Sequence, residues 1–113
     1  MTSEWEMLVN DFNGMVCSSI DQAISDALSI RVMESLYMYL RKNHKMAREE
    51  VPSHLDTFFS AMESVFGVMG TRTIGRIAAR NLYAQLHLKF DDRDGLTLSD
   101  YVDEAKDKMQ AGP

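Results

Sequence analysis

Apolar residues recur every three or four positions along most of the chain, and this spacing constrains the fold more than any other feature. The spacing matches the 3.6 residues per turn of an α-helix, so each run places its apolar side chains on one face. A helix with one apolar face must pack against another element. A chain of 113 residues has the length of one domain. We therefore predict a single mainly α domain over residues 1–113, a compact bundle of four to five helices.

Capping residues divide the first half of the chain. Ser3 and Glu6 have the spacing of a capping box at the start of a first helix over about 4–17. A second apolar run covers 19–43. It is either one helix or two, and we favour a break near Ser29 because this serine can cap a new helix.

Proline marks the next boundary. Residues 47–51 can form one turn, and Pro52 disfavours helical geometry at Val51, so this turn should end there. Ser53 should then cap the following helix.

Glycine ends that helix. Gly67 is a suitable left-handed C-cap, and residues 68–70 should form a short link to a further helix over about 71–86. Gly70 belongs to this link.

The last part of the chain contains an acidic turn. Apolar residues alternate on both sides of 91–95, so a short two-strand hairpin can form at 88–98. An isolated ribbon is only marginally stable, so the bundle with the hairpin and the bundle without it both stay open. A last helix should begin at Ser99, and residues 110–113 should form a frayed tail.

Three arginines form a stripe on one helix. Arg72, Arg76 and Arg80 are four residues apart and span an arc of about 80°. Such a stripe can contact phosphates, but no aromatic or amide side chains interleave with it to read bases. The net charge of −5 also repels nucleic acid. We favour a protein contact or ion pairs, and weak nucleic-acid binding is the alternative. The acidic residues expected to meet the stripe are Glu49, Glu50, Asp56, Glu63, Asp103 and Glu104.

The segment 36–40, Leu-Tyr-Met-Tyr-Leu, places apolar groups on more than one side of its helix. Such a helix is either central in the bundle or leaves one side for a partner. Tyrosine supplies amphipathic contact area, and arginine supplies bidentate contacts. The predicted interaction residues are therefore Tyr37, Tyr39, Arg72, Arg76 and Arg80, with an unidentified protein or a second copy as the partner.

Motifs for catalysis or metal binding are missing from the sequence. The histidines at 44, 54 and 87 lack the spacing of zinc ligands. The segment 90–101 resembles a calcium loop in its middle, but Phe90 and Tyr101 occupy the first and last ligand positions. We therefore expect no enzyme activity, no catalytic residues, no metal and no cofactor.

Two further features concern the compartment. No apolar run reaches the ~18 residues of a membrane span, and the acidic start of the chain, Met1–Glu6, is unlike a signal peptide. Cys17 stands alone between apolar residues and should be buried. We predict a cytoplasmic protein that does not bind membranes.

A resemblance to a known family rests on five segments in a fixed order. They are Val32-Met-Glu-Ser-Leu-Tyr-Met-Tyr-Leu-Arg-Lys, Glu49-Glu-Val-Pro, Phe58-Phe-Ser-Ala-Met-Glu-Ser-Val-Phe-Gly67, Ile77-Ala-Ala-Arg-Asn-Leu-Tyr83, and Leu88-Lys-Phe with Leu98-Ser-Asp-Tyr-Val. Their order and spacing resemble a small archaeal domain family of unknown function, similar to the Nitrosopumilus-type output domain. The resemblance implies an archaeal regulatory output module, and it implies no active-site residues. The chain departs from the family pattern at Met46 and Ala47, and at His87, where the pattern has glycine before Leu88.

Overall fold

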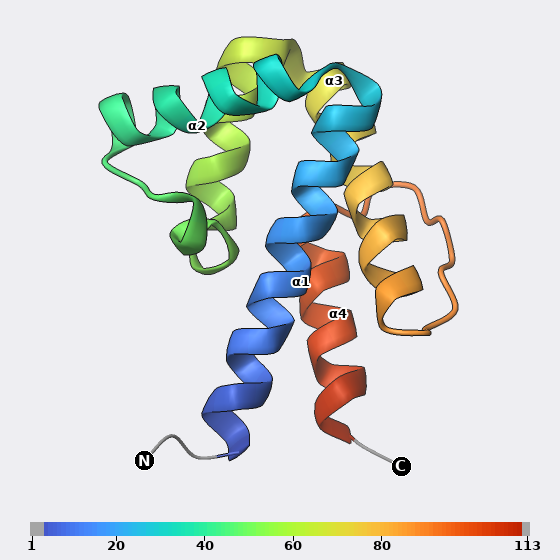
Figure 1. Ribbon diagram of the computed structural model, residues 1–113. Coiled ribbons are helices and arrows are strands. Elements are labelled where there is room, and N and C mark those ends of the chain that lie inside the picture. The colour runs from blue at the N-terminus through green and yellow to red at the C-terminus, as the bar shows by residue number, and fades with distance from the viewer. Residues whose placement is uncertain (1–3, 112–113) are drawn as a thin grey trace.

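The computed structural model describes the backbone of residues 4–111 and the side chains of residues 11–109, and it confirms the mainly α fold. Along this part of the chain there are four α-helices, one 3-10 helix and no β-strand. In chain order they are α1 (Glu4–Ala27), α2 (Ile30–His44), η1 (Arg48–Ser53), α3 (Leu55–Gln85) and α4 (Leu98–Ala111) (Figure 1). Ser3, and with it the expected capping box, lies outside the described residues.

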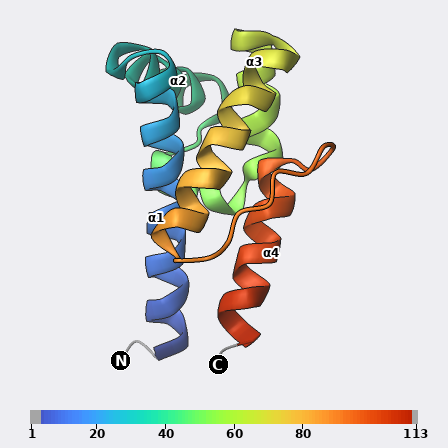
Figure 2. The same ribbon diagram turned by 90° about the vertical axis from the view of Figure 1, so that its right-hand side faces the viewer.

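The long helices α1 and α3 pack along each other and form the centre of the bundle. α4 packs on α3, so that α3 lies between α1 and α4 (Figure 2). α2 crosses one end of the molecule, and α1 also contacts η1. Cys17 is buried, as predicted. The largest fully buried side chains come from every helix except α4: Val16, Ile20, Ile24, Leu40, Val51, Phe58, Met62, Leu82 and Tyr83.

α1 is one continuous helix, so the expected boundary near residue 18 is wrong. Ser19 is buried, its hydroxyl oxygen accepts a hydrogen bond from Gln85 Nε2 at 2.8 Å, and its carbonyl accepts one from Asn81 Nδ2 at 3.4 Å. Ser19 therefore packs against α3 instead of ending the helix. The break at Ser29 is confirmed, because its hydroxyl accepts a hydrogen bond from the backbone N–H of Val32 at 3.1 Å.

The boundary around Pro52 lies later than expected. η1 continues through Pro52 to Ser53, and His54 is the residue before α3. Ser53 is therefore inside η1, and the prediction that it caps α3 is wrong. The backbone N–H groups of Glu50 and His54 donate to the carbonyls of Ala47 and Val51, and these bonds form without an N–H at Pro52.

Gly67 divides α3 into two parts, as its sequence position predicted. Its φ of +79° and ψ of 170° are non-helical, and a side chain would strain this backbone. The expected link over 68–70 is wrong, because the helix resumes directly after the kink. The hydroxyl of Thr71 donates to the Gly67 carbonyl at 2.8 Å and holds the two parts together.

The hairpin that the sequence left open at 88–98 does not form, since the described chain has no β-strand there. The half-buried side chains of Leu88, Phe90 and Leu96 pack on the helical core, and the backbone between them binds Tyr101 instead of a partner strand. The Tyr101 hydroxyl accepts a hydrogen bond from Arg93 N–H at 2.8 Å and lies 3.3 Å from the carbonyls of Asp91 and Arg93. Packing on α3 and α4 satisfies this segment better than an isolated ribbon would.

α4 begins one residue earlier than expected and ends later. Its cap is Thr97, not Ser99: the Asp100 carboxylate accepts from Thr97 N–H at 3.0 Å, and the Thr97 hydroxyl accepts from Asp100 N–H at 3.2 Å. The helix continues to Ala111 through the first part of the expected tail, and residues 112–113 lie outside the described chain.

Candidate functional site

The five residues predicted to form one interaction surface lie in different places. Tyr37 and Tyr39 are on α2, and the three arginines are on the second part of α3. Tyr39 lines an apolar groove between α2 and α3, whereas Arg72 and Arg76 line a separate polar cavity. Arg80 is exposed and lines neither of these two hollows. The predicted residues therefore do not converge on one site.

Tyr37 connects two helices of the fold, and its hydroxyl does not face outward as a contact group. Its half-buried hydroxyl donates to Asp21 Oδ1, and Asp21 Oδ2 also accepts from Arg48 Nε at 2.8 Å. Burial, and then the hydrogen bond to Asp21, raise the pKa of Tyr37, so the hydroxyl stays protonated and continues to donate. This cluster joins α1, α2 and η1, which makes the Tyr37 hydroxyl part of the fold.

The arginine stripe is partly neutralised by the segment after α3. Arg76 Nε lies 3.1 Å from Asp92 Oδ1, and an Arg76 terminal nitrogen lies 3.9 Å from Asp94. These partners differ from the acidic residues that we expected, although Asp56 and Glu63 line the same cavity of about 330 Å³ as Arg72 and Arg76. Carboxylates beside the arginines weaken the attraction of this face for phosphate.

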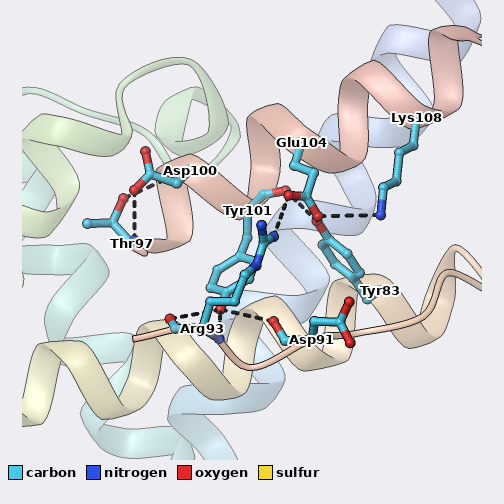
Figure 3. A network of polar contacts seen from close by, with 8 residues as sticks. All are labelled: Tyr83, Asp91, Arg93, Thr97, Asp100, Tyr101, Glu104 and Lys108. Atoms are coloured by element: carbon cyan, nitrogen blue, oxygen red, sulfur yellow. Dashed lines mark hydrogen bonds and ion pairs between the residues drawn. The ribbon is translucent and has the colours of Figure 1, made fainter. Parts of the chain in front are cut away.

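A second polar cluster, which the sequence did not predict, holds the segment 86–97 against α4 (Figure 3). The buried hydroxyl of Tyr83 donates to Glu104 Oε1 at 2.8 Å, Arg93 donates to Glu104 Oε2, and Lys108 Nζ lies 3.4 Å from Oε1. Arg93, and then Tyr83, lower the pKa of Glu104 to about 2. Burial and the bond to Glu104 raise the pKa of Tyr83. The cluster is a structural clamp, because each group in it already has a partner.

An apolar hollow lies between α2 and the first part of α3. This α2–α3 groove, of about 430 Å³, is lined by Val32, Leu36, Tyr39, Val65 and Phe66, with Arg31 and Ser35 at its edge. The turn of α3 that contains the kink lies beside α2 at the same end of the molecule (Figures 1 and 2). That turn exposes large apolar side chains.

Val68 and Met69 directly follow Gly67 in this turn, and we call them the kink knob. They are 56% and 72% exposed, and Val65 at the groove is 50% exposed. Sequence reasoning assigned the knob to a link and missed it. The sequence feature that could have indicated the knob is the segment 64–71. Its eight residues carry no charge, whereas 26% of the chain is charged.

The structure also bears on metals and membranes. Among side chains 11–109, no group of three His, Cys, Asp or Glu residues is arranged to hold a metal ion. Within the described part of the chain, no helix combines the length and the apolar character that crossing a membrane requires.

Comparison with protein-family models, with curated proteins and with solved structures finds no match for this chain. The similarity to the archaeal output-domain family therefore stays a prediction from the sequence pattern.

Proposed function

We propose that this protein is a non-enzymatic interaction module that binds another protein chain through the α2–α3 groove and the kink knob. One observation carries the proposal: an apolar groove is lined by the half-exposed Val65, and Val68 and Met69 are exposed three and four residues further along α3. Contiguous exposed apolar surface on a folded domain is typical of a protein contact site.

The energetics favour burial of this surface. Fully burying an exposed Val or Met side chain contributes about 1.5–3 kcal/mol, and covering the exposed half or more of Val65, Val68 and Met69 would contribute the corresponding part of it. Met69 is also flexible, and thioether side chains adapt well to irregular contact surfaces. A partner that covers these three residues would therefore gain affinity without any rearrangement of the core.

The proposal changes the role of the predicted residues. Tyr39 remains in the interaction surface, because its ring lines the groove. Tyr37 is excluded from the proposed contact because its hydroxyl binds Asp21. Arg72, Arg76 and Arg80 lie outside this groove, so they are not part of the proposed contact.

The alternative, weak nucleic-acid binding through the arginine stripe, is less well supported. Arg76 already has two carboxylate neighbours, Asp92 and Asp94, and the whole chain has a net charge of −5. Bringing a phosphate backbone to the stripe would also bring it to these aspartates, which lowers the affinity. A regulatory output role in the cytoplasm stays a prediction from the sequence.

Site-specific photo-crosslinking tests the proposal. A photoreactive amino acid replaces Val65 in the groove or, as a control, Met109 on α4, which is similarly exposed. Each full-length variant is irradiated in extract of the source organism. We expect a protein adduct from position 65 and none from position 109. Equal labelling at both positions, or no adduct at position 65, would refute the proposed surface.

A further inference from the structure

We propose that the polar cavity between the two parts of α3 binds a small zwitterion, an α-amino acid with an aromatic side chain. The two parts of α3 diverge from the kink at Gly67 (Figure 1), both contribute to the lining of the cavity, and residues 95–99 complete it. The cavity shares no lining residue with the α2–α3 groove. The proposed ligand site is therefore separate from the proposed protein contact and goes beyond it.

Exposed charges of both signs line this cavity without pairing. Asp56 and Glu63 come from the first part of α3, and Arg72 comes from the second part. Among side chains 11–109, none of these three forms an ion pair, although all three line the same cavity. A guanidinium group binds a carboxylate in a bidentate manner, and a carboxylate accepts charge-assisted hydrogen bonds from an ammonium group. A ligand that carries a carboxylate and an ammonium group would therefore match both walls of the cavity.

A simple anion matches the cavity less well. The other two arginines that line it are already paired, Arg76 with Asp92 and Arg93 with Glu104. Arg72 is therefore the one arginine of the lining that forms no ion pair among the described side chains. The net charge of −5 also repels an anion, whereas a zwitterion carries no net charge and is not repelled.

The least exposed lining residues are apolar and aromatic, and we call them the floor of the cavity. They include Phe59, which is half-buried, and the buried residues Gly75, Leu98 and Tyr101. Aromatic rings pack favourably on each other, and an apolar cavity of about 150 Å³ is large enough to hold benzene. The cavity here has about 330 Å³, which is enough for an aromatic ring and the charged groups attached to it. An apolar floor with a few charged groups around it is also typical of small-molecule sites.

An NMR titration of the full-length, nitrogen-15-labelled chain at pH 7 tests the proposal. The probes are L-phenylalanine, 3-phenylpropionate, which lacks the ammonium group, and 2-phenylethylamine, which lacks the carboxylate. We expect L-phenylalanine to shift the backbone amide signals of Thr71, Gly75 and Ser99 at the cavity, with a dissociation constant of about 1 mM or lower. Each analogue should bind at least about tenfold more weakly, because it leaves the charge of one wall without a partner.

A variant of the arginine tests the carboxylate end of the ligand. Arg72→Gln should weaken the binding of L-phenylalanine at least about tenfold. Arg80→Gln is the matched control, because Arg80 is exposed on the same part of α3 but does not line the cavity. It should bind L-phenylalanine like the wild type, and circular dichroism confirms that both variants are folded.

A double variant tests the ammonium end. Asp56→Asn/Glu63→Gln should also weaken the binding of L-phenylalanine at least about tenfold. Asp26→Asn/Glu34→Gln removes the same number of negative charges from exposed positions outside the cavity, and it should leave the binding unchanged. Equal weakening in both double variants would show an effect of net charge alone and would refute the site.

The remaining outcomes are equally decisive. Unchanged spectra at about 10 mM L-phenylalanine, or shifts confined to amides away from the cavity, refute the proposal. If 3-phenylpropionate or 2-phenylethylamine binds as tightly as L-phenylalanine, the cavity takes an anion or a cation, and the zwitterion is refuted. The crosslinking at position 65 reports on a different surface, so the proposed function and the proposed ligand can each fail alone.

Discussion

The clamp between α3, the segment 86–97 and α4 predicts that Tyr83→Phe destabilises the fold. The Tyr83 hydroxyl belongs to a side chain that is 1% exposed, and it donates to Glu104 Oε1 at 2.8 Å. It also lies 3.2 Å from the carbonyl of Tyr101. The substitution removes one hydroxyl and keeps the ring, so the packing against Phe90 and Tyr101 is preserved.

The expected size of the effect follows from the partners. A hydrogen bond to a charged group contributes about 1.5–3 kcal/mol. Glu104 keeps Arg93 and Lys108, and its side chain is 29% exposed, so water can replace part of the lost bond. We therefore expect the lower end, a loss of about 1.5 kcal/mol in the free energy of unfolding. For 113 residues this lowers the midpoint of thermal unfolding by about 6 °C.

The effect should depend on pH in a defined direction. The pKa of Glu104 is about 2 in the folded chain, below its ordinary value of 4.5. A lowered folded-state pKa stabilises the fold above pH 4.5, and this stability is lost as the pH falls from 4.5 towards about 2. Tyr83→Phe removes part of this contribution. The stability difference between the two proteins should therefore be largest at pH 7 and smaller near pH 2.

Urea unfolding followed by circular dichroism at both pH values measures the difference. Tyr39→Phe is the control, since no hydrogen bond to its hydroxyl is present among the described side chains, and it should change stability by less than about 0.5 kcal/mol. Equal stability of Tyr83→Phe and wild type at pH 7, or a difference that does not shrink near pH 2, would refute the role of the Tyr83–Glu104 bond.

Three further predictions follow from other contacts. Ser29→Ala should cost about 1 kcal/mol in a urea titration, because Ser29 caps α2, whereas Ser53→Ala, which removes no cap, should stay within about 0.5 kcal/mol. His87→Gly should raise the unfolding free energy by about 0.5–1 kcal/mol, because His87 has a φ of +58°, and a less stable variant would contradict this. In gel-shift titrations at low salt, wild type should not retard DNA or RNA, and a retardation that Arg72/Arg76/Arg80→Ala abolishes would restore the nucleic-acid hypothesis.

The helical fold was predictable because its causes lie close together in the chain. The apolar spacing predicted α2 and both parts of α3, and Ser29 and Gly67 marked the two breaks correctly. Two of the errors share one cause. Ser19 and Ser53 look like helix ends when only their neighbours are considered, but Ser19 packs against α3 and Ser53 lies inside η1.

The candidate site was less predictable than the fold. Tyr39 lines the groove, and its role as an interaction residue stays a prediction. Tyr37 looks equivalent in the sequence, but its hydroxyl donates a hydrogen bond to Asp21. The Arg76 partners, Asp92 and Asp94, were missed because the sequence pattern does not show that the segment after α3 turns back towards Arg76.

By itself, then, the sequence determined which segments become helices and where two of them break, because capping, helical period and the backbone freedom of Gly67 act over a few residues. The tertiary structure alone decided that the segment 86–97 is clamped by Tyr101 and Glu104, and that Val68 and Met69 stay uncovered. Those outcomes depend on which faces of distant helices meet, and burial is a property of the packed bundle and not of any one segment.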